Sequence, residues 1–191
     1  FILCTLSLVF FSCLGQENKS EKTLLTISPI INKQDGINVK IIESLTAFLD
    51  SKNQSLTENP YWLASDFQKY GYPYYDLYLM EESKYGKDFY KPTLMEILPV
   101  DNPSMKIIKL AYIGHHPTTH ENQLKSIYNL MAQIDGEKVY FSKYLDYASR
   151  QWTSIVKGSI HYKISPNRIA NPIQMEKQIK DIEKVCQFFN T

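Results

Sequence analysis

The chain has 191 residues, of which 43% are hydrophobic and 21% charged, a composition that suits a globular protein with one complete domain and part of another. Its 21 basic residues against 20 acidic ones leave a net charge of +1, so the chain lacks the strong positive charge that nucleic acids and anionic membranes attract. These numbers exclude a nonspecific polyanion binder and indicate no particular reaction.

The first predicted element is a secretory signal peptide at residues 1–15. Residues 1–14 are almost wholly apolar, and a polar run follows at once from Gln16. The apolar run is too short to cross a bilayer, which takes about 20 residues, and it is typical of a signal peptide that lacks its charged start. A buried N-terminal strand or helix is the alternative, but it leaves the abrupt polar edge unexplained. We therefore expect a secreted protein of the periplasm, cell envelope or exterior.

Two cleavage routes fit this segment. Ser12-Cys13 resembles a loose lipobox, in which Cys13 carries a lipid anchor and makes the protein a lipoprotein whose only membrane contact is that anchor. Alternatively, small residues at Cys13 and Gly15 suit ordinary signal peptidase, which releases a chain that starts at Gln16. Both routes stay open. On either one Cys186 is the remaining ordinary thiol, so we expect no internal disulfide.

Residues 16–34 are predicted to be a polar tether, and residues 35–156 an α+β domain that begins with helices. The first helix ends near Lys52, because four apolar residues recur at helical spacing before it: Ile41, Leu45, Phe48 and Leu49. A second helix is expected from Asn59-Pro60 to Gly71, with Trp62, Leu63 and Phe67 on its inner face. Pro73 starts a third, which runs to Gly86.

Strands are expected after Pro92, where the apolar pattern changes from helical spacing to alternation. In the first strand, Leu94, Glu96 and Leu98 are expected to share one face. The predicted strands cover residues 94–98, 106–114, 128–134 and 139–141, with a hairpin turn at Asp135-Gly136. Ser142 is expected to cap a short helix from Lys143 to Trp152. Helices first and strands afterwards predict an α+β fold in which N-terminal helices pack on a curved antiparallel sheet.

Residues 157–191 are predicted to begin a second domain, of which this chain holds only a fragment. A strand is expected at residues 160–164, and Asn171-Pro172 opens a last helix whose apolar face contains Ile179, Ile182, Cys186 and Phe189. Such a face needs a partner. We expect it to pack against a downstream domain of the same polypeptide that follows residue 191.

Three of the four histidines lie within six residues, at His115, His116 and His120, and Glu121 follows them. Imidazole and carboxylate groups suit Zn²⁺, and a short loop can bring them to one ion. However, Pro117 and two threonines disfavour a helix here, and adjacent histidines on a strand point to opposite faces. We therefore interpret the cluster as a solvated connection between strands and expect no metal and no other cofactor in this chain.

Eight of the fourteen tyrosines lie between Tyr61 and Tyr90. They could line a groove for a peptide, glycan or small ligand, since the ring stacks while the hydroxyl forms hydrogen bonds. We favour the alternative, in which the rings pack on the sheet and keep their hydroxyls at its rim. Asp76, Glu81 and Glu82 are assigned to a solvated helix face. The chain lacks the HExxH, GxSxG, CxxC, GxGxxG and P-loop motifs, so we assign it no catalytic and no cofactor-binding residue.

Three stretches carry a resemblance to known proteins. Residues 61–67 (YWLASDF) and 73–78 (PYYDLY) resemble exported Bacteroidota proteins whose N-terminal region is similar to the nuclear transport factor two-like, or cystatin-like, α+β fold. Residues 160–167 (IHYKISPN), with the helix up to Phe189, resemble the first strand and helix of the gluzincin-type peptidase domain that follows in such proteins. The resemblance implies Zn²⁺ only in the downstream region. The zinc motif of that family has no counterpart here, so its ligands and catalytic Glu are assigned to no residue of this chain.

The sequence therefore predicts a noncatalytic exported module that packs against, or presents substrate to, a downstream domain, which the resemblance identifies as a zinc peptidase. The alternative is a small-ligand or enzymatic pocket inside the α+β domain. A polar residue that projects inward from a strand among tyrosines would favour the pocket, whereas a filled apolar interior would favour the module.

Overall fold

The computed structural model describes residues 24–189, so the predicted signal peptide, Cys13, Gly15 and residues 16–23 of the tether lie outside the described part. The elements follow in the order β1 (Thr26–Ile27), α1 (Gly36–Ser51), α2 (Ala64–Tyr70), the 3₁₀ turn η1 (Tyr75–Leu77), β2 (Tyr90–Pro99), β3 (Met105–His115), β4 (Asn122–Asp135), β5 (Lys138–Lys143), α3 (Tyr144–Ala148), β6 (Thr153–Lys157), β7 (Ile160–Ile164) and α4 (Pro172–Phe189). The protein is therefore of the mixed α+β class, as predicted. Across residues 24–189, no helix combines the length and the apolar character that crossing a membrane requires.

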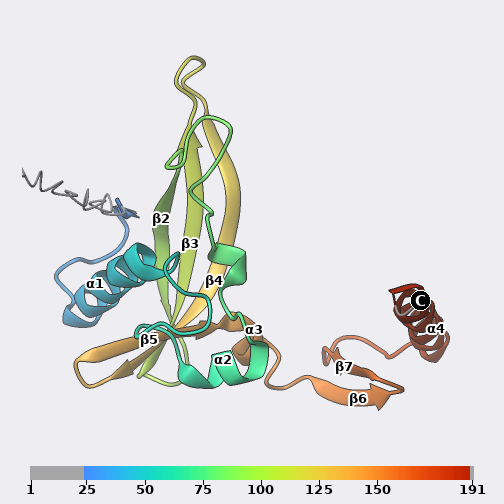
Figure 1. Cartoon of the computed structure of the whole chain (residues 1–191). Coiled ribbons are helices and arrows are strands. Elements are labelled where there is room, and N and C mark those ends of the chain that lie inside the picture. Colours follow the sequence, from blue (N-terminus) through green and yellow to red (C-terminus); the bar gives the residue numbers. More distant parts are fainter. Residues whose placement is uncertain (1–23, 190–191) are drawn as a thin grey trace, which may run out of the picture.

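The strands form two sheets (Figure 1). The larger sheet has the order β1-β2-β3-β4-β5, in which β1 is parallel to β2 and every other neighbour is antiparallel. The smaller sheet is the hairpin β6-β7. In Figure 1 this hairpin and α4 lie to one side of the larger sheet, beyond the connection that follows α3.

Helix α1 packs its predicted face on the larger sheet. Asp35 caps it, because the side chain accepts hydrogen bonds from the backbone N–H groups of Ile37 at 2.8 Å and Asn38 at 3.1 Å. Its four apolar residues are at most 2% exposed, and they join a core that includes Leu94, Ile108, Leu110 and Phe141. The helical spacing thus predicted both the helix and its buried face correctly.

A bulge in β2 changes which residues face the core. The register with β3 shifts between Leu94 and Glu96, so that Leu94 and Ile97 both contact the core while Glu96 forms an ion pair with Lys109 of β3. The prediction that Leu94, Glu96 and Leu98 share one face is therefore wrong. Strand β4 also begins six residues before the predicted start at Tyr128, because the mixed polar side chains of its first half hide the strand pattern.

The helices after α1 are shorter than predicted. Helix α2 ends at Gly71 as expected, but it begins at Ala64 because the preceding residues pair with β5: Leu63 N–H donates to Phe141 at 2.9 Å, and Phe141 N–H to Tyr61 at 2.7 Å. The predicted helix 73–86 is wrong beyond the single turn η1, since the chain leaves helical geometry at Tyr78, whose ψ is 129°, and continues through Leu79, whose φ is 51°. Helix α3 covers only part of residues 143–152, and no side chain caps it, because Ser142 belongs to β5.

The C-terminal segment contains the predicted strand and helix together with one strand that the pattern did not reveal. Strand β6 pairs with β7 around a turn at Gly158, whose φ is 59°. Helix α4 lies on this hairpin, where Tyr162 donates a hydrogen bond to the Met175 carbonyl at 3.2 Å and Lys157 lies 3.0 Å from Glu176. The hairpin contains positions 156 and 157, between which the domain boundary was predicted.

Candidate functional site

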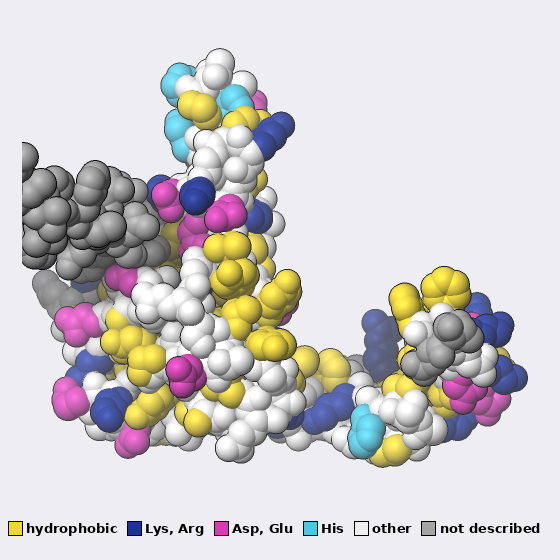
Figure 2. All heavy atoms as spheres, in the orientation of Figure 1, with side chains coloured by type: hydrophobic (Ala, Val, Ile, Leu, Met, Phe, Trp, Pro, Cys, Tyr) yellow, Lys and Arg dark blue, Asp and Glu magenta, His cyan; other side chains and the backbone are white. Residues whose placement is uncertain are grey.

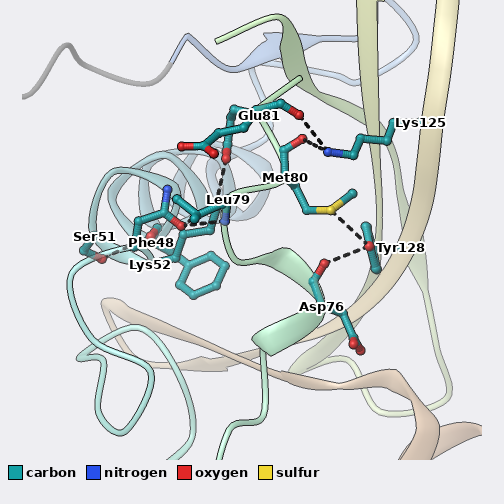
Figure 3. A network of polar contacts seen from close by, with 11 residues as sticks. Phe48, Ser51, Lys52, Asp76, Leu79, Met80, Glu81, Lys125 and Tyr128 are labelled. Carbon is teal, nitrogen blue, oxygen red and sulfur yellow. Dashed lines mark hydrogen bonds and ion pairs between the residues drawn. The ribbon is translucent and has the colours of Figure 1, made fainter. Parts of the chain in front are cut away.

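The most unusual chemistry of the described residues is a buried ion pair at the end of α1 (Figure 3). The Lys52 side chain is fully buried, and its Nζ donates to Glu81 Oε2 at 2.9 Å and to Asn53 Oδ1 at 2.9 Å. Asn53 Oδ1 also accepts a hydrogen bond from Leu79 N–H at 3.1 Å. The pair therefore ties the end of α1 to the segment that follows η1, and Glu81 is not on a solvated helix face as predicted.

Burial dominates the electrostatics of this pair. Desolvation lowers the pKa of Lys52, while the charge of Glu81 and the hydrogen bond to it oppose that shift. Because both charges are withdrawn from water, their mutual attraction has to offset a desolvation cost of several kcal/mol for each ion. Removal of either partner alone would leave the other charge buried without compensation.

On the sheet side, Tyr112 of β3 projects into the same interior. Its side chain is fully buried, and burial first, then the charge of Glu81, raises its pKa well above the ordinary value. Three buried side-chain oxygens have no hydrogen-bond partner among the described residues: Glu81 Oε1, Tyr112 OH and Ser126 Oγ. Ser126 lies directly opposite Tyr112 on β4. Tyr112 thus projects a polar group inward from a strand, but it lies within the apolar core and lines neither of the pockets described below.

Two residues of β4 hold the segment 76–82 against the sheet. Lys125 Nζ donates to the carbonyls of Met80 and Glu82, each at 3.0 Å, and Tyr128 OH donates to the Asp76 carbonyl at 2.8 Å (Figure 3). The segment that carries Glu81 is therefore bonded to the end of α1 on one side and to β4 on the other. Lys52 and Glu81 are buried and paired with each other. The pair is therefore better suited to stabilise the fold than to act as an acid and a base on a substrate.

Trp62 lines two open pockets. We call the first the helix pocket; it has a volume of about 670 Å³, and its lining includes Ser51, Ser55, Asn59, Trp62, Ala64 and Phe67. The second, the strand-edge pocket, has a volume of about 390 Å³ and is lined by residues that include Trp62, Leu77, Ile127, Leu130, Leu145 and Ala148. None of the buried ionisable residues Lys52, Glu81 and Tyr112 lines either pocket.

A buried carboxylate orients Trp62, the residue that lines both pockets. Asp66 of α2 is 6% exposed, and its Oδ2 accepts hydrogen bonds from Trp62 Nε1 at 3.1 Å and from the backbone N–H of Lys143 at 2.9 Å. These bonds orient the indole ring and join α2 to the end of β5. Sequence patterns did not indicate this role, because Lys143 lies 77 residues from Asp66.

The three clustered histidines lie at the tip of the β3-β4 hairpin, where Figure 2 shows histidine side chains gathered. The rings of His115 and His120 are 5.7 Å apart. His116 Nδ1 accepts hydrogen bonds from the backbone N–H groups of Thr118 at 3.3 Å and Thr119 at 3.1 Å, so that nitrogen is occupied by the loop itself. In residues 24–189 no set of three or more His, Cys, Asp or Glu side chains could hold a metal ion.

The tyrosines between Tyr61 and Tyr90 differ in their surroundings. Tyr74 is 1% exposed and packs in the core, where its hydroxyl donates to the Ser55 carbonyl. Tyr72, Tyr75 and Tyr85 are exposed. No tyrosine lines the helix pocket, whereas Tyr74, Tyr128 and Tyr144 line the strand-edge pocket.

No protein-family model, curated protein or solved structure matches this chain. The likeness to nuclear transport factor two-like and gluzincin-type proteins rests on the three sequence stretches given above and stays a prediction.

Proposed function

We propose that this chain is a noncatalytic exported module that packs against a further domain of the same polypeptide through α4. The observation that carries the proposal is the apolar surface of this helix (Figure 2). Ile182, Val185 and Phe189 recur at i, i+3 and i+7, and they are 43%, 55% and 78% exposed. The small hairpin beneath α4 buries only Met175 among the helix residues.

The exposed apolar face of α4 is large on the scale of a domain's net stability. Complete burial of an apolar side chain of this size contributes roughly 1.5–3 kcal/mol, and a domain has a net stability of about 5–15 kcal/mol. Three such residues on one helix face are therefore a substantial source of docking energy. The zinc-peptidase character of the docked domain follows only from the resemblance of residues 160–167.

Site-specific photocrosslinking in cells that express the complete gene tests this proposal. A benzophenone amino acid at Val185, on the apolar face, is expected to crosslink to a segment outside residues 24–189 of the same polypeptide. The matched control places it at Lys180, on the opposite face of α4, where no such product is expected. Equal crosslinking at the two positions, or none at Val185, contradicts the proposal.

Export is tested by fractionation of the same cells. The cleaved product is expected outside the cytosol, and an uncleaved cytosolic product contradicts the prediction. The Cys13→Ser variant separates the two cleavage routes, because only the lipoprotein route loses acyl labelling and membrane attachment when Cys13 is replaced.

The helix pocket supports a second candidate function, a small-ligand site. Its volume of about 670 Å³ lies within the range of about 300–1,000 Å³ that ligand sites occupy, and Trp62 and Phe67 give it apolar walls. The fluorescent dye anilinonaphthalene sulfonate is a suitable probe. If the pocket binds apolar ligands, dye binding is lost in Ala64→Phe, which fills the pocket, and is kept in Ala148→Ser, which alters the other pocket.

A further inference from the structure

Strand β4 extends well beyond its neighbour β5. It runs from Asn122 to Asp135, but β5 pairs with it only from Leu130 to Asp135. Along residues 122–129, β4 has β3 on one side, and no strand within residues 24–189 pairs with its other side (Figure 1). Such an edge presents main-chain donors and acceptors to an incoming chain.

The register shows which backbone groups face the open side. Ile134 N–H donates to the Ser104 carbonyl at 2.8 Å, which places the backbone groups of Ile134 on the β3 side. Consecutive residues of a strand direct these groups to alternate sides, and the register is continuous back to Ser126. The N–H and C=O of Ile127 therefore point away from β3.

The strand-edge pocket lies beside this same stretch. Residues Ile127 to Leu130 form one of its sides, while η1 and α3 supply apolar side chains that include Leu77, Leu145 and Ala148. Its volume of about 390 Å³ is sufficient for an apolar side chain with part of its backbone. Asp76 and Lys143 also line it, with Oδ2 and Nζ 3.6 Å apart, so the pocket carries one charge of each sign.

We propose that the open edge of β4 binds a short extended peptide, which adds as a strand beside Ile127 and places an apolar side chain in the strand-edge pocket. In this mode main-chain hydrogen bonds provide affinity, and the side-chain pocket provides selectivity. The balanced charges of Asp76 and Lys143 suit a segment without net charge. The inference rests on the proposed function, in which the module serves a downstream domain, and it names the substrate that the module presents as an apolar peptide. It uses no residue of α4.

The occupant is a short peptide and not the β4 strand of a second copy. Lys125 is an extra residue between the pairs Ile113–Leu124 and Tyr112–Ser126, and this bulge interrupts the straight edge that a long strand pairing needs. At the other end, β5 pairs with β4 from Leu130 onward. The open stretch between these two limits is short.

A random peptide library displayed on phage, selected against the full chain, supplies the probe. We expect enriched peptides to be apolar and to bind Ile127→Pro about tenfold more weakly, because proline removes the outward N–H and spares the bonds to β3. Leu145→Glu should weaken binding at least as much by placing a charge in the pocket.

The controls are Ile127→Val, which keeps the N–H, and Val156→Glu on β6, and both should bind like the wild type. Melting curves confirm that each variant is folded.

The geometry of binding is tested by N-methylation of the enriched peptide at each position in turn. A peptide that adds as a strand should lose binding at alternate positions only, because every second N–H faces β4. Failure to enrich any peptide, equal binding by Ile127→Pro and wild type, or a methylation profile without alternation overturns the proposal. Dimerisation of the wild-type chain that Ile127→Pro abolishes overturns it in favour of a second copy. Loss of crosslinking at Val185 would overturn the role of α4 and leave this result intact.

Discussion

Helices α1 and α4 have the same local design and very different surroundings. Each is amphipathic, and each begins with a side chain that accepts two backbone N–H groups, Asp35 for α1 and Asn171 for α4. Each of the four residues on the apolar face of α1 is at most 2% exposed, whereas α4 buries only Met175. The difference lies in the partner, because α1 meets a five-stranded sheet and α4 meets a two-stranded hairpin, which by itself supplies little apolar area.

The aromatic residues extend this contrast. Phe48 of α1 has ring contacts with Trp62 at 5.2 Å, Tyr74 at 5.2 Å and Phe141 at 5.7 Å between centroids. On α4, Phe189 has a ring contact with its neighbour Phe188 and is 78% exposed. An amphipathic pattern therefore specifies a helix and its apolar face, but the opposing surface decides how much that face stabilises the fold.

The largest expected difference between the two helices is at phenylalanine. Phe48→Ala should lower the free energy of unfolding by about 3–5 kcal/mol, since it removes a ring from a fully packed core. Phe189→Ala, the matched change on α4, should alter it by less than about 0.5 kcal/mol. Urea unfolding followed by circular dichroism measures both. Similar losses for the two variants would show that α4 belongs to the main core.

The Lys52–Glu81 pair should be nearly as important as the aromatic core. Lys52→Met leaves the Glu81 carboxylate buried without its partner and is expected to cost about 3–5 kcal/mol. The double variant Lys52→Met/Glu81→Met should recover most of that loss, because an apolar pair carries no desolvation cost. Lys40→Ala breaks the exposed pair with Glu137 and serves as the control, with an expected change below about 1 kcal/mol. A double variant no more stable than the single one would refute this account.

The helix caps test how far each helix is coupled to the whole fold. Asp35→Ala should lower global stability by about 0.5–2 kcal/mol, because α1 is part of the core. Asn171→Ala removes the same kind of bond, but its effect should appear as faster amide hydrogen exchange within α4 alone. If Asn171→Ala shifted the melting temperature as much as Asp35→Ala, the two regions would unfold together.

A smaller effect is expected at Tyr112. Tyr112→Phe deletes a buried hydroxyl that has no partner among the described residues, so stability at neutral pH should rise by about 1 kcal/mol. The pKa of Tyr112 is raised in the folded state, so the wild type should lose stability as the pH rises above 10, the ordinary value for tyrosine. The variant should lack that part of the loss. Unfolding curves at neutral and alkaline pH measure both effects, and a destabilised variant would indicate a bonded hydroxyl.

The smallest effect is expected from removal of the whole C-terminal region. Within residues 24–189, no residue of the main hydrophobic core lies beyond Phe141, so a chain that ends at Trp152 should keep its melting temperature within a few degrees. Limited proteolysis of the intact chain should cut first between Ser165 and Pro172, where an exposed loop joins β7 to α4. Unfolding of the shortened chain would show that the hairpin supports the larger sheet.

Several elements could be predicted from local spacing in the sequence. The face of α1, the end of α2 at Gly71 and the start of α4 at Pro172 agree with the structure, and the predicted hairpin turn at Asp135-Gly136 lies one residue later, at Gly136-Glu137. Each depends on the period of apolar residues or on the backbone preferences of Gly, Pro and Asx residues within a few positions. The mixed α+β class follows from the order of those elements.

Contacts between residues far apart in the chain could not be predicted in this way, because they depend on the folded arrangement of the elements. Lys52 and Glu81 are 29 residues apart, and the prediction of an exposed Glu81 failed because the burial of a charge depends on a partner that no local pattern reveals. Most of the helix predicted over residues 73–86 is absent, and Lys125 and Tyr128 bind this segment to the sheet. These two residues lie 43 to 52 positions further along the chain than the carbonyls they contact. The open edge of β4 arises likewise from the unequal lengths of two paired strands, since an edge is a property of the sheet and not of any single strand.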